Sequence, residues 1–267
     1  MSKRALPINY SIENMVRCIE EDNAAGNRYT EAEKMALYAD CRRRVDANPK
    51  LKRVLSLSHV RNCRVPGAEW IARIGVLPPQ CVVVDRRIKE LCALPFWLHG
   101  EDKDGKPVKR FGKCPGYDFL PGCPPHSIPA GEVEERLKKA DILVVLQTKL
   151  LSESGIAWKF RLLRRLASDI EKAAGKGAVV ERYGSGPCGA CKIQSCLSRE
   201  PCASPALRTE ALESMGISVD RICRDLAALT GQKAWEIRWI RHFGFREQTP
   251  KEWKYVMALG VRLPPDR

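Results

Sequence analysis

The sequence predicts an α/β protein, in which a small mixed sheet with flanking helices and cysteine-rich loops follows a mainly helical N-terminal region. Residues 142–146 form a continuous apolar run, which is typical of a strand covered on both faces. Amphipathic helical patterns flank this run at 129–139 and 156–174, and a β-branched run follows at 178–180. Such alternation favours a sheet with helices packed on it.

The N-terminal region is predicted to be helical over about its first 80 residues, beginning with a helical pattern at 11–21. Thr30 and Glu33 have the spacing of a capping box, in which each side chain bonds to the other residue's backbone N–H. The helix that starts there can continue to Asn48, because Pro49 disfavours continuation. We therefore expect two parts, a helical N-terminal region at 1–90 and a cysteine-rich α/β domain at 91–267.

Shorter elements are predicted from local composition. Residues 81–84 are β-branched and predict a short strand, whereas the Gly- and Pro-rich stretch 100–127 predicts an irregular loop. Ser204, followed by proline, has the form of a helix N-cap. Two further strands are expected near 235–241 and 253–260.

The composition restricts the compartment and the partners. We find no apolar run of about 18 residues and no apolar leader behind the basic start, so we expect a cytoplasmic protein with no membrane association. The net charge is +14, from 46 Lys and Arg against 32 Asp and Glu. Such a charge attracts anionic partners: an acidic electron carrier or redox enzyme, an anionic small molecule, or nucleic acid.

Twelve cysteines are too many for a disulfide framework in a reducing compartment, so clustered cysteines indicate metal or redox chemistry. Isolated cysteines, by contrast, pack as small hydrophobic residues. Five cysteines have no second cysteine nearby in sequence and are assigned to packing: Cys18, Cys41, Cys63, Cys81 and Cys223.

The strongest signal is the pattern C-x2-C-x4-C-x5-C, formed by Cys188, Cys191, Cys196 and Cys202. Four thiolates within fifteen residues suit either zinc or an iron–sulfur cluster. Four-cysteine zinc sites usually use two separate C-x2-C pairs, whereas here a single pair is followed closely by two more ligands. The pattern therefore favours an iron–sulfur cluster, of the 4Fe–4S type, over zinc.

A first cysteine pair precedes this cluster. Cys114 and Cys123 are either further metal ligands or spare thiols, and Cys92 upstream is a candidate additional ligand. Tyr117 and His126 are candidates for substrate or proton-transfer contacts, with plain packing or loop roles as the alternatives.

These motifs resemble those of a known family. Cys-Pro-Gly-Tyr…Cys-Pro-Pro at 114–125 and Gly-Pro-Cys-x2-Cys…Cys…Pro-Cys-x2-Pro at 186–205 are similar to motifs of cysteine-rich, predicted metal-binding proteins of unknown function from anaerobic bacteria and archaea. The resemblance covers about 110–220 and implies metal or cluster binding without naming a reaction. The family pattern has one more cysteine two residues before Cys114, where this chain has Gly112, so the first pair either lacks a ligand or recruits Cys92.

Three functional hypotheses follow. A redox protein would pass electrons from one or two fully ligated clusters to a partner enzyme or a bound substrate. An enzyme would keep one iron of a 4Fe–4S cluster open as a Lewis acid, for example in sulfur chemistry, and an incomplete ligand set favours it. A zinc-stabilised nucleic-acid-binding module fits the charge but lacks zinc-finger spacing and aromatic RNA-binding signatures. We find no Walker loop and no G-x-G-x-x-G or G-x-S-x-G motif.

Overall fold

The structure is a computed structural model, and it describes the larger part of the chain. The described residues are 19, 21–22, 29–63, 71–93, 96–101, 107–112, 116–120, 122–150, 156–185, 188, 191, 202, 204, 207–231 and 253–265.

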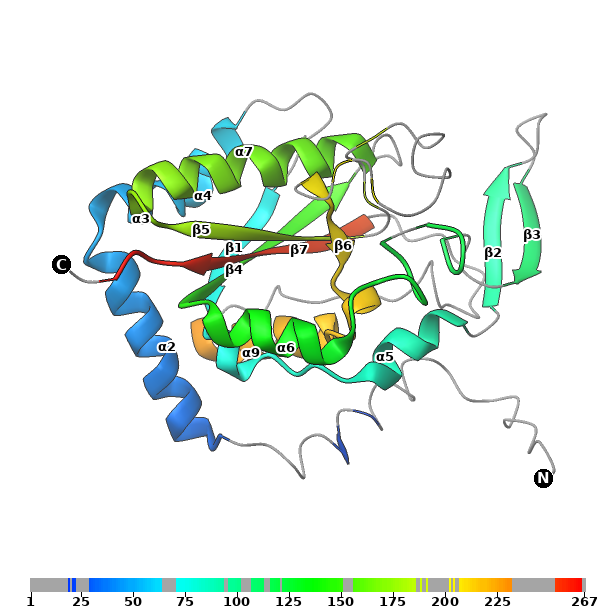
Figure 1. Ribbon diagram of the computed structural model, residues 1–267, viewed down its shortest axis with the longest axis horizontal. Helices are drawn as coiled ribbons and strands as arrows, with labels where there is room; N and C mark the ends of the chain where they lie inside the picture. The colour runs from blue at the N-terminus through cyan, green and yellow to red at the C-terminus, as the bar shows by residue number, and fades with distance from the viewer. Residues whose placement is uncertain are drawn as a thin grey trace.

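A five-stranded mixed sheet forms the centre of the molecule (Figure 1). β1 pairs with β4, β4 with β7 and β7 with β5, all antiparallel, whereas the short β6 lies parallel to β5. The strands in their order across the sheet are β1 (Ile71–Leu77), β4 (Ile142–Leu150), β7 (Trp253–Arg262), β5 (Val179–Gly184) and β6 (Glu210–Ala211).

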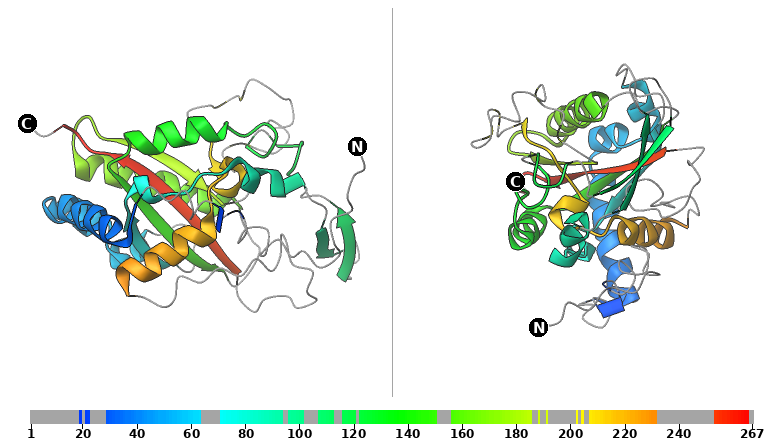
Figure 2. Two further views of the ribbon diagram at one scale, coloured as in Figure 1. Left: turned by 90° about the horizontal axis from the view of Figure 1, so that it is seen from below. Right: turned by 90° about the vertical axis from the view of Figure 1, so that its right-hand side faces the viewer.

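Helices cover both faces of this sheet, so the described part of the chain has three layers (Figure 2). The long helix α7 lies on one face with the N-terminal helices, and α6 and α9 lie on the other. The N-terminal helices are α2 (Glu31–Asp46), α3 (Pro49–Val54) and α4 (Leu57–Asn62). The other helices that cover the sheet are α6 (Ala130–Lys139), α7 (Ile156–Ala174) and α9 (Val219–Thr230).

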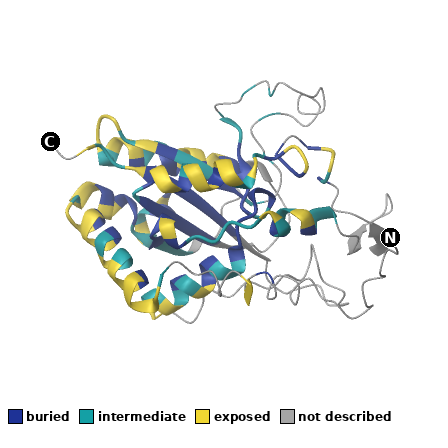
Figure 3. Cartoon of the chain, turned by 60° about the horizontal axis from the view of Figure 1, so that its bottom comes forward, coloured by how far each residue is buried: buried dark blue, intermediate teal, exposed yellow. Residues whose placement is uncertain are grey.

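The alternation of β4 side chains explains the two cores. Ile142, Val144 and Leu146 belong to the apolar cluster under α7, whereas Leu143 and Val145 belong to the cluster under α6 and α9. Successive side chains of a strand point to opposite faces, so a strand covered on both faces must be apolar at every position. The predicted two-sided burial of this run is confirmed, and Figure 3 shows buried strands between helices with exposed outer faces.

The N-terminal helices share the first of these cores with the sheet. Cys41, Val45 and Leu51 lie in the same cluster as Ile142 of β4 and Leu166 of α7. Buried contacts therefore run from the predicted helical region into the predicted α/β domain, while the boundary at residue 90 stays a prediction.

Several local predictions are confirmed. The capping box of Thr30 and Glu33 is formed at the start of α2, and α7 ends before Gly175, whose φ of 101° favours glycine. The strands predicted around 178–180 and 253–260 are β5 and β7. The strand predicted near 235–241 and most of the helix predicted at 11–21 lie outside the described residues.

Three local predictions need correction. Residues 71–77, predicted as helical, form β1, because their backbone pairs antiparallel with the buried strand β4. Residues 81–84 form no strand beyond one bridge between Val84 and Ile217, and a 3-10 helix, η1 (Pro79–Cys81), occupies their start. The predicted irregular loop contains a strand, which makes a separate hairpin: β2 (Phe96–Glu101) pairs with β3 (Pro107–Gly112).

The short connecting elements between η1 and the hairpin are α5 (Arg86–Glu90) and the 3-10 helix η2 (Leu91–Ala93). A further 3-10 helix, η4 (Glu213–Met215), precedes α9. None of the described helices is long and apolar enough to cross a membrane.

Candidate metal centre at the cysteine loops

The second cysteine segment begins where β5 ends. Gly184 closes β5 against residues 207–212, because the Leu212 N–H donates to the Gly184 carbonyl at 3.2 Å. A Cβ atom on Gly184 would lie 2.8 Å from Cγ2 of Thr209, so only glycine allows this approach. The parallel β5–β6 pair thus holds Thr209 beside the chain that leads to Cys188.

Cys188 receives a backbone hydrogen bond from that neighbouring segment. The Thr209 N–H donates to the Cys188 sulfur, with 3.4 Å between nitrogen and sulfur. Hydrogen bonds of this kind orient a metal-ligating sulfur and tune the properties of the bound metal. Cys188 is therefore already held in a position and an environment suited to a ligand.

The first cysteine loop folds tightly around Cys123. A Cβ atom on Gly116 would lie only 2.8 Å from the Cys123 sulfur, so the chain two residues after Cys114 lies directly against that sulfur. The Cys123 N–H donates to the Leu120 carbonyl at 2.9 Å, which closes the loop. The close approach of Gly116 requires the absence of a side chain.

The two cysteine loops meet at Gly122. A Cβ atom on Gly122 would lie 3.3 Å from the Thr209 carbonyl oxygen and 3.9 Å from the Cys188 Cβ. The Ser214 hydroxyl, in η4, lies 3.0 Å from the Gly122 carbonyl oxygen, to which it donates. The Ser127 hydroxyl in turn donates to the Ser214 carbonyl at 2.6 Å. The residue before Cys123 thus lies near Cys188.

The described residues do not complete a cysteine ligand set. Cys123 is buried, whereas Cys188, Cys191 and Cys202 are half-buried, and Cys114 and Cys196 lie outside the described residues. Among the residues that the structure describes, no three of these sulfurs lie within 4.8 Å of one another. Thiolates from two adjoining loops suit a soft metal or a cluster, and the six-cysteine ligand set stays a prediction.

Cys92 lies on η2, which is tied to the first loop through α5. The Lys89 ammonium donates to the carbonyls of Ser127 and Ile128, at 2.8 and 3.3 Å. Burial lowers the pKa of Lys89, while the nearby Glu210 and Cys92 raise it. Cys92 is therefore near the end of the Cys123 loop, and its role as an additional ligand stays a prediction.

Tyr117 and His126 belong to the same loop. Tyr117 is half-buried, and the His126 imidazole is exposed, with Nε2 lying 3.2 Å from the Asp118 carboxylate. The Arg208 guanidinium donates to the His126 carbonyl at 2.9 Å. The His126 backbone is thus anchored to the segment before β6, while its side chain stays at the surface.

A cleft of about 400 Å³ adjoins these loops. Its charged lining consists of three guanidinium groups and two carboxylates, from Arg136, Arg182, Arg208, Glu181 and Glu210. Arg208 and Glu210 flank Thr209 in sequence, so one end of the cleft lies next to the residue that bonds to the Cys188 sulfur.

Glu210 is the most deeply buried acid of this cleft, with 5% of the residue exposed. Burial raises the pKa of Glu210, while the Ile128 N–H and the Arg208 guanidinium lower it. One Glu210 oxygen accepts from Ile128 at 2.8 Å, and the other lies 2.5 Å from Arg208. This carboxylate therefore links the first loop to β6.

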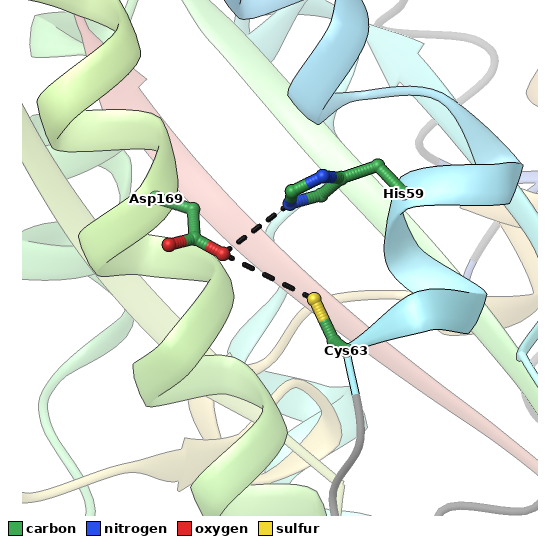
Figure 4. Close-up of side chains that lie close together, drawn as sticks. All are labelled: His59, Cys63 and Asp169. Carbon is green, nitrogen blue, oxygen red and sulfur yellow. Dashed lines mark hydrogen bonds and ion pairs between the residues drawn. The ribbon is translucent and has the colours of Figure 1, made fainter.

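A second group of metal-ligating side chains was missed by the sequence analysis. His59, Cys63 and Asp169 place one ligand atom each within 4.8 Å of the others, although Cys63 was assigned to packing (Figure 4). Cys63 is indeed buried, and burial together with the Asp169 charge raises the pKa of its thiol. The spacing of His59 and Cys63, four residues apart, was a usable local signal. The other described packing cysteines, Cys41, Cys81 and Cys223, are buried as predicted.

Comparison with known families supports the metal-binding assignment. Residues 108–234 match the model of a family described as "Predicted metal-binding protein (DUF2284)", whose function is unknown. The resemblance inferred from the cysteine motifs is thereby confirmed over that segment. The match includes both cysteine loops, and it excludes the helices α2–α4. No curated protein and no solved structure matches the chain.

Proposed function

We propose that the two cysteine loops hold an iron–sulfur cluster and that the protein passes electrons to a partner enzyme or a bound substrate. One observation carries the proposal: Gly122, adjacent to Cys123, lies so near Cys188 that a Cβ added to it would be 3.9 Å from the Cys188 Cβ, and the Cys188 sulfur accepts the Thr209 N–H. Sulfurs from both loops can therefore contribute to one centre. An iron–sulfur cluster, when bound, supplies one-electron chemistry, whose potential depends on hydrogen bonds to the sulfurs.

Anaerobic purification of the full chain tests the nature of the metal. We expect a brown protein with broad absorbance near ~400 nm and iron matched by acid-labile sulfide. A colourless protein that contains zinc and no sulfide would contradict the cluster and support the zinc-stabilised nucleic-acid module instead.

Ligand substitutions test the proposed set. Cys188→Ser and Cys191→Ser should lose most of the iron and sulfide and lower the unfolding free energy of the metal-loaded protein, because the site orders its loops. Cys223→Ser is the matched control, since this thiol belongs to α9 and is buried within the second apolar cluster. Equal metal loss in all three variants would contradict the division of the cysteines into ligands and packing residues.

The cleft favours a second candidate, an enzyme that binds an anionic substrate beside the metal centre. The cleft carries three guanidinium groups against two carboxylates, and its end adjoins Thr209. Arg182→Gln should then weaken the binding of small anions, measured by calorimetry, without changing the metal content. If Arg182→Gln binds small anions as tightly as the wild type does, the cleft no longer supports an enzyme that binds an anionic substrate there.

The basic face of α7 suggests how an acidic electron carrier would dock. Arg161, Arg164 and Arg165 are exposed on this helix. Attraction between such charges and an acidic surface is screened by salt. Arg161→Glu combined with Arg164→Glu should slow association with an acidic ferredoxin or flavodoxin at low salt and leave the cluster content unchanged. Tight RNA or DNA binding without electron transfer to any carrier would contradict the redox function.

A further inference from the structure

His59, Cys63 and Asp169 come together from two helices at a place separate from the cysteine loops. His59 lies in α4 and Cys63 caps its C-terminal end, where the Cys63 N–H donates to the His59 carbonyl at 3.1 Å. Residues four apart in a helical turn lie on the same face, so the imidazole and the thiol both face α7. Asp169 of α7 points toward the two side chains (Figure 4).

The distances fit a single small cation. His59 Nε2 lies 3.3 Å from Asp169 Oδ2, and Cys63 Sγ lies 4.0 Å from the same oxygen. A tetrahedral zinc ion with bonds of about 2.0–2.3 Å separates its nitrogen, oxygen and sulfur ligands by roughly 3.3–3.7 Å. The nitrogen–oxygen separation already matches this range, the sulfur–oxygen separation exceeds it by a few tenths of an ångström, and the nitrogen and the sulfur lie within 4.8 Å of each other.

The chemistry of the three donors also fits zinc. A neutral imidazole, a thiolate and a carboxylate together carry two negative charges, which a divalent cation neutralises. Neutral first coordination shells suit partly buried places, where an unpaired charge is costly. Here the side chains of His59 and Asp169 are 31% and 18% exposed, and Cys63 is buried. Imidazole, thiolate and carboxylate are the usual zinc donors in proteins.

The arrangement differs from that of a nucleophilic cysteine. In such sites the imidazole lies between the thiol, which it deprotonates, and the carboxylate, which orients it. Here the carboxylate oxygen contacts both the imidazole and the thiol (Figure 4). The three ligand atoms lie within 4.8 Å of one another, so one small cation placed between them could contact all three.

We propose that His59, Cys63 and Asp169 form a zinc-type divalent-cation site with three protein ligands and a fourth position for water. The site joins α4 to α7, so the ion would fasten the N-terminal helices to the segment that matches the metal-binding family. His59 and Cys63 precede that segment, whereas Asp169 lies within it. This site does not depend on the cysteine loops or on their proposed cluster.

Metal analysis of the full chain, purified without oxygen and equilibrated with zinc against a competing chelator, tests the site. His59→Ala and Asp169→Asn should each lose about one zinc ion per chain relative to the wild type. Iron and labile sulfide should stay unchanged, which separates this outcome from a failure of the proposed cluster. Cys41→Ala is the matched control, because it removes another buried thiol from the same apolar cluster. If His59→Ala and Asp169→Asn retain the zinc content of Cys41→Ala, the proposal is overturned.

Stability measurements distinguish a metal site from a plain hydrogen bond between the two helices. Zinc should raise the unfolding midpoint of the wild type and of Cys41→Ala, but not that of Asp169→Asn, since a bound ion stabilises only the folded chain that binds it. An equal loss of stability in Asp169→Asn with and without zinc would mean that His59 and Asp169 merely bond to each other, and would overturn the proposal.

Arg165 offers a variant that leaves all three ligands in place. Its Nε lies 3.7 Å from Asp169 Oδ2, and its side chain is 61% exposed. This guanidinium competes with a cation for the carboxylate, so Arg165→Gln should bind zinc several-fold more tightly. A zinc affinity no higher than that of the wild type, in folded Arg165→Gln, would also contradict the site.

Discussion

In the sheet, β4 contributes side chains to both apolar clusters, whereas in the first cysteine loop the buried residues Leu120 and Cys123 belong to neither. Burial of apolar area stabilises the sheet, at about 25 cal/mol per Å². The loop is instead held by hydrogen bonds, such as those of Ser127 and Ser214, and by close glycine contacts. The sheet is therefore stabilised mainly by apolar burial, whereas the first cysteine loop depends on polar and close backbone contacts that a metal bound by the loop would strengthen.

The largest expected effect lies in the core. Leu166 of α7 is fully buried in the first cluster, so Leu166→Ala should lower the unfolding free energy by about 2–5 kcal/mol, measured by urea denaturation. The loss should be the same in metal-loaded and chelated protein. Arg161→Ala, on the exposed face of the same helix, should change stability by less than about 0.5 kcal/mol. A metal-dependent loss in Leu166→Ala would break the comparison.

A smaller effect, with the opposite metal dependence, is expected in the first loop. In Gly116→Ala the new Cβ would lie 2.8 Å from the Cys123 sulfur and displace it. We expect a loss of about 1–3 kcal/mol from overpacking, together with lower metal content. Gly131→Ala is the control, because its Cβ meets nothing within 4 Å and alanine favours the helix α6 by about 0.5–1 kcal/mol. Full metal retention in Gly116→Ala would show that Cys123 is not a ligand.

The contact between the two loops can be weakened through one hydroxyl. Ser214 is 3% exposed, and its single hydroxyl hydrogen is shared between the carbonyl oxygens of Gly122 and Ala211, which lie 3.0 and 2.7 Å from the hydroxyl oxygen. Ser214→Ala should lower the unfolding free energy by about 1–2 kcal/mol and reduce the metal content. Ser218→Ala should lose about 1 kcal/mol by removing the N-cap of α9, with no metal loss. Equal metal content in both variants would mean that the hydroxyl does not help to hold the two loops together.

The smallest effect concerns pH. Burial raises the pKa of Glu210, so the stability that its protonated form contributes is present below the unfolded-chain value of 4.5 and is lost as the pH rises through the folded-state pKa. Glu210→Gln should therefore gain stability relative to the wild type as the pH rises above that value, measured in chelated protein. The hydrogen bond with Lys138 lowers the pKa of Glu135. Glu135→Gln should therefore lose stability relative to the wild type as the pH rises. A stability difference between Glu210→Gln and the wild type that does not change with pH would contradict the raised pKa of Glu210.

Much of the architecture follows from local sequence. The capping box of α2, the helix α7 and the two-sided burial of β4 were all predicted, because helix caps and apolar periods depend only on neighbouring residues. The hairpin β2–β3 and the strand β1 were not predicted. The Gly- and Pro-rich composition of 100–127 predicted an irregular loop where β3 forms, and β1 becomes a strand through its pairing with β4.

The candidate metal ligands of the cysteine loops can be identified from local spacing, since C-x2-C involves only neighbouring residues. Which distant residues meet depends on how the helices and strands pack. The β5–β6 pair brings Thr209 to Cys188, and the packing of α4 on α7 brings His59 and Cys63 to Asp169. Such contacts depend on how helices and strands pack around a shared core, and periodicity within any one segment carries no information about that packing.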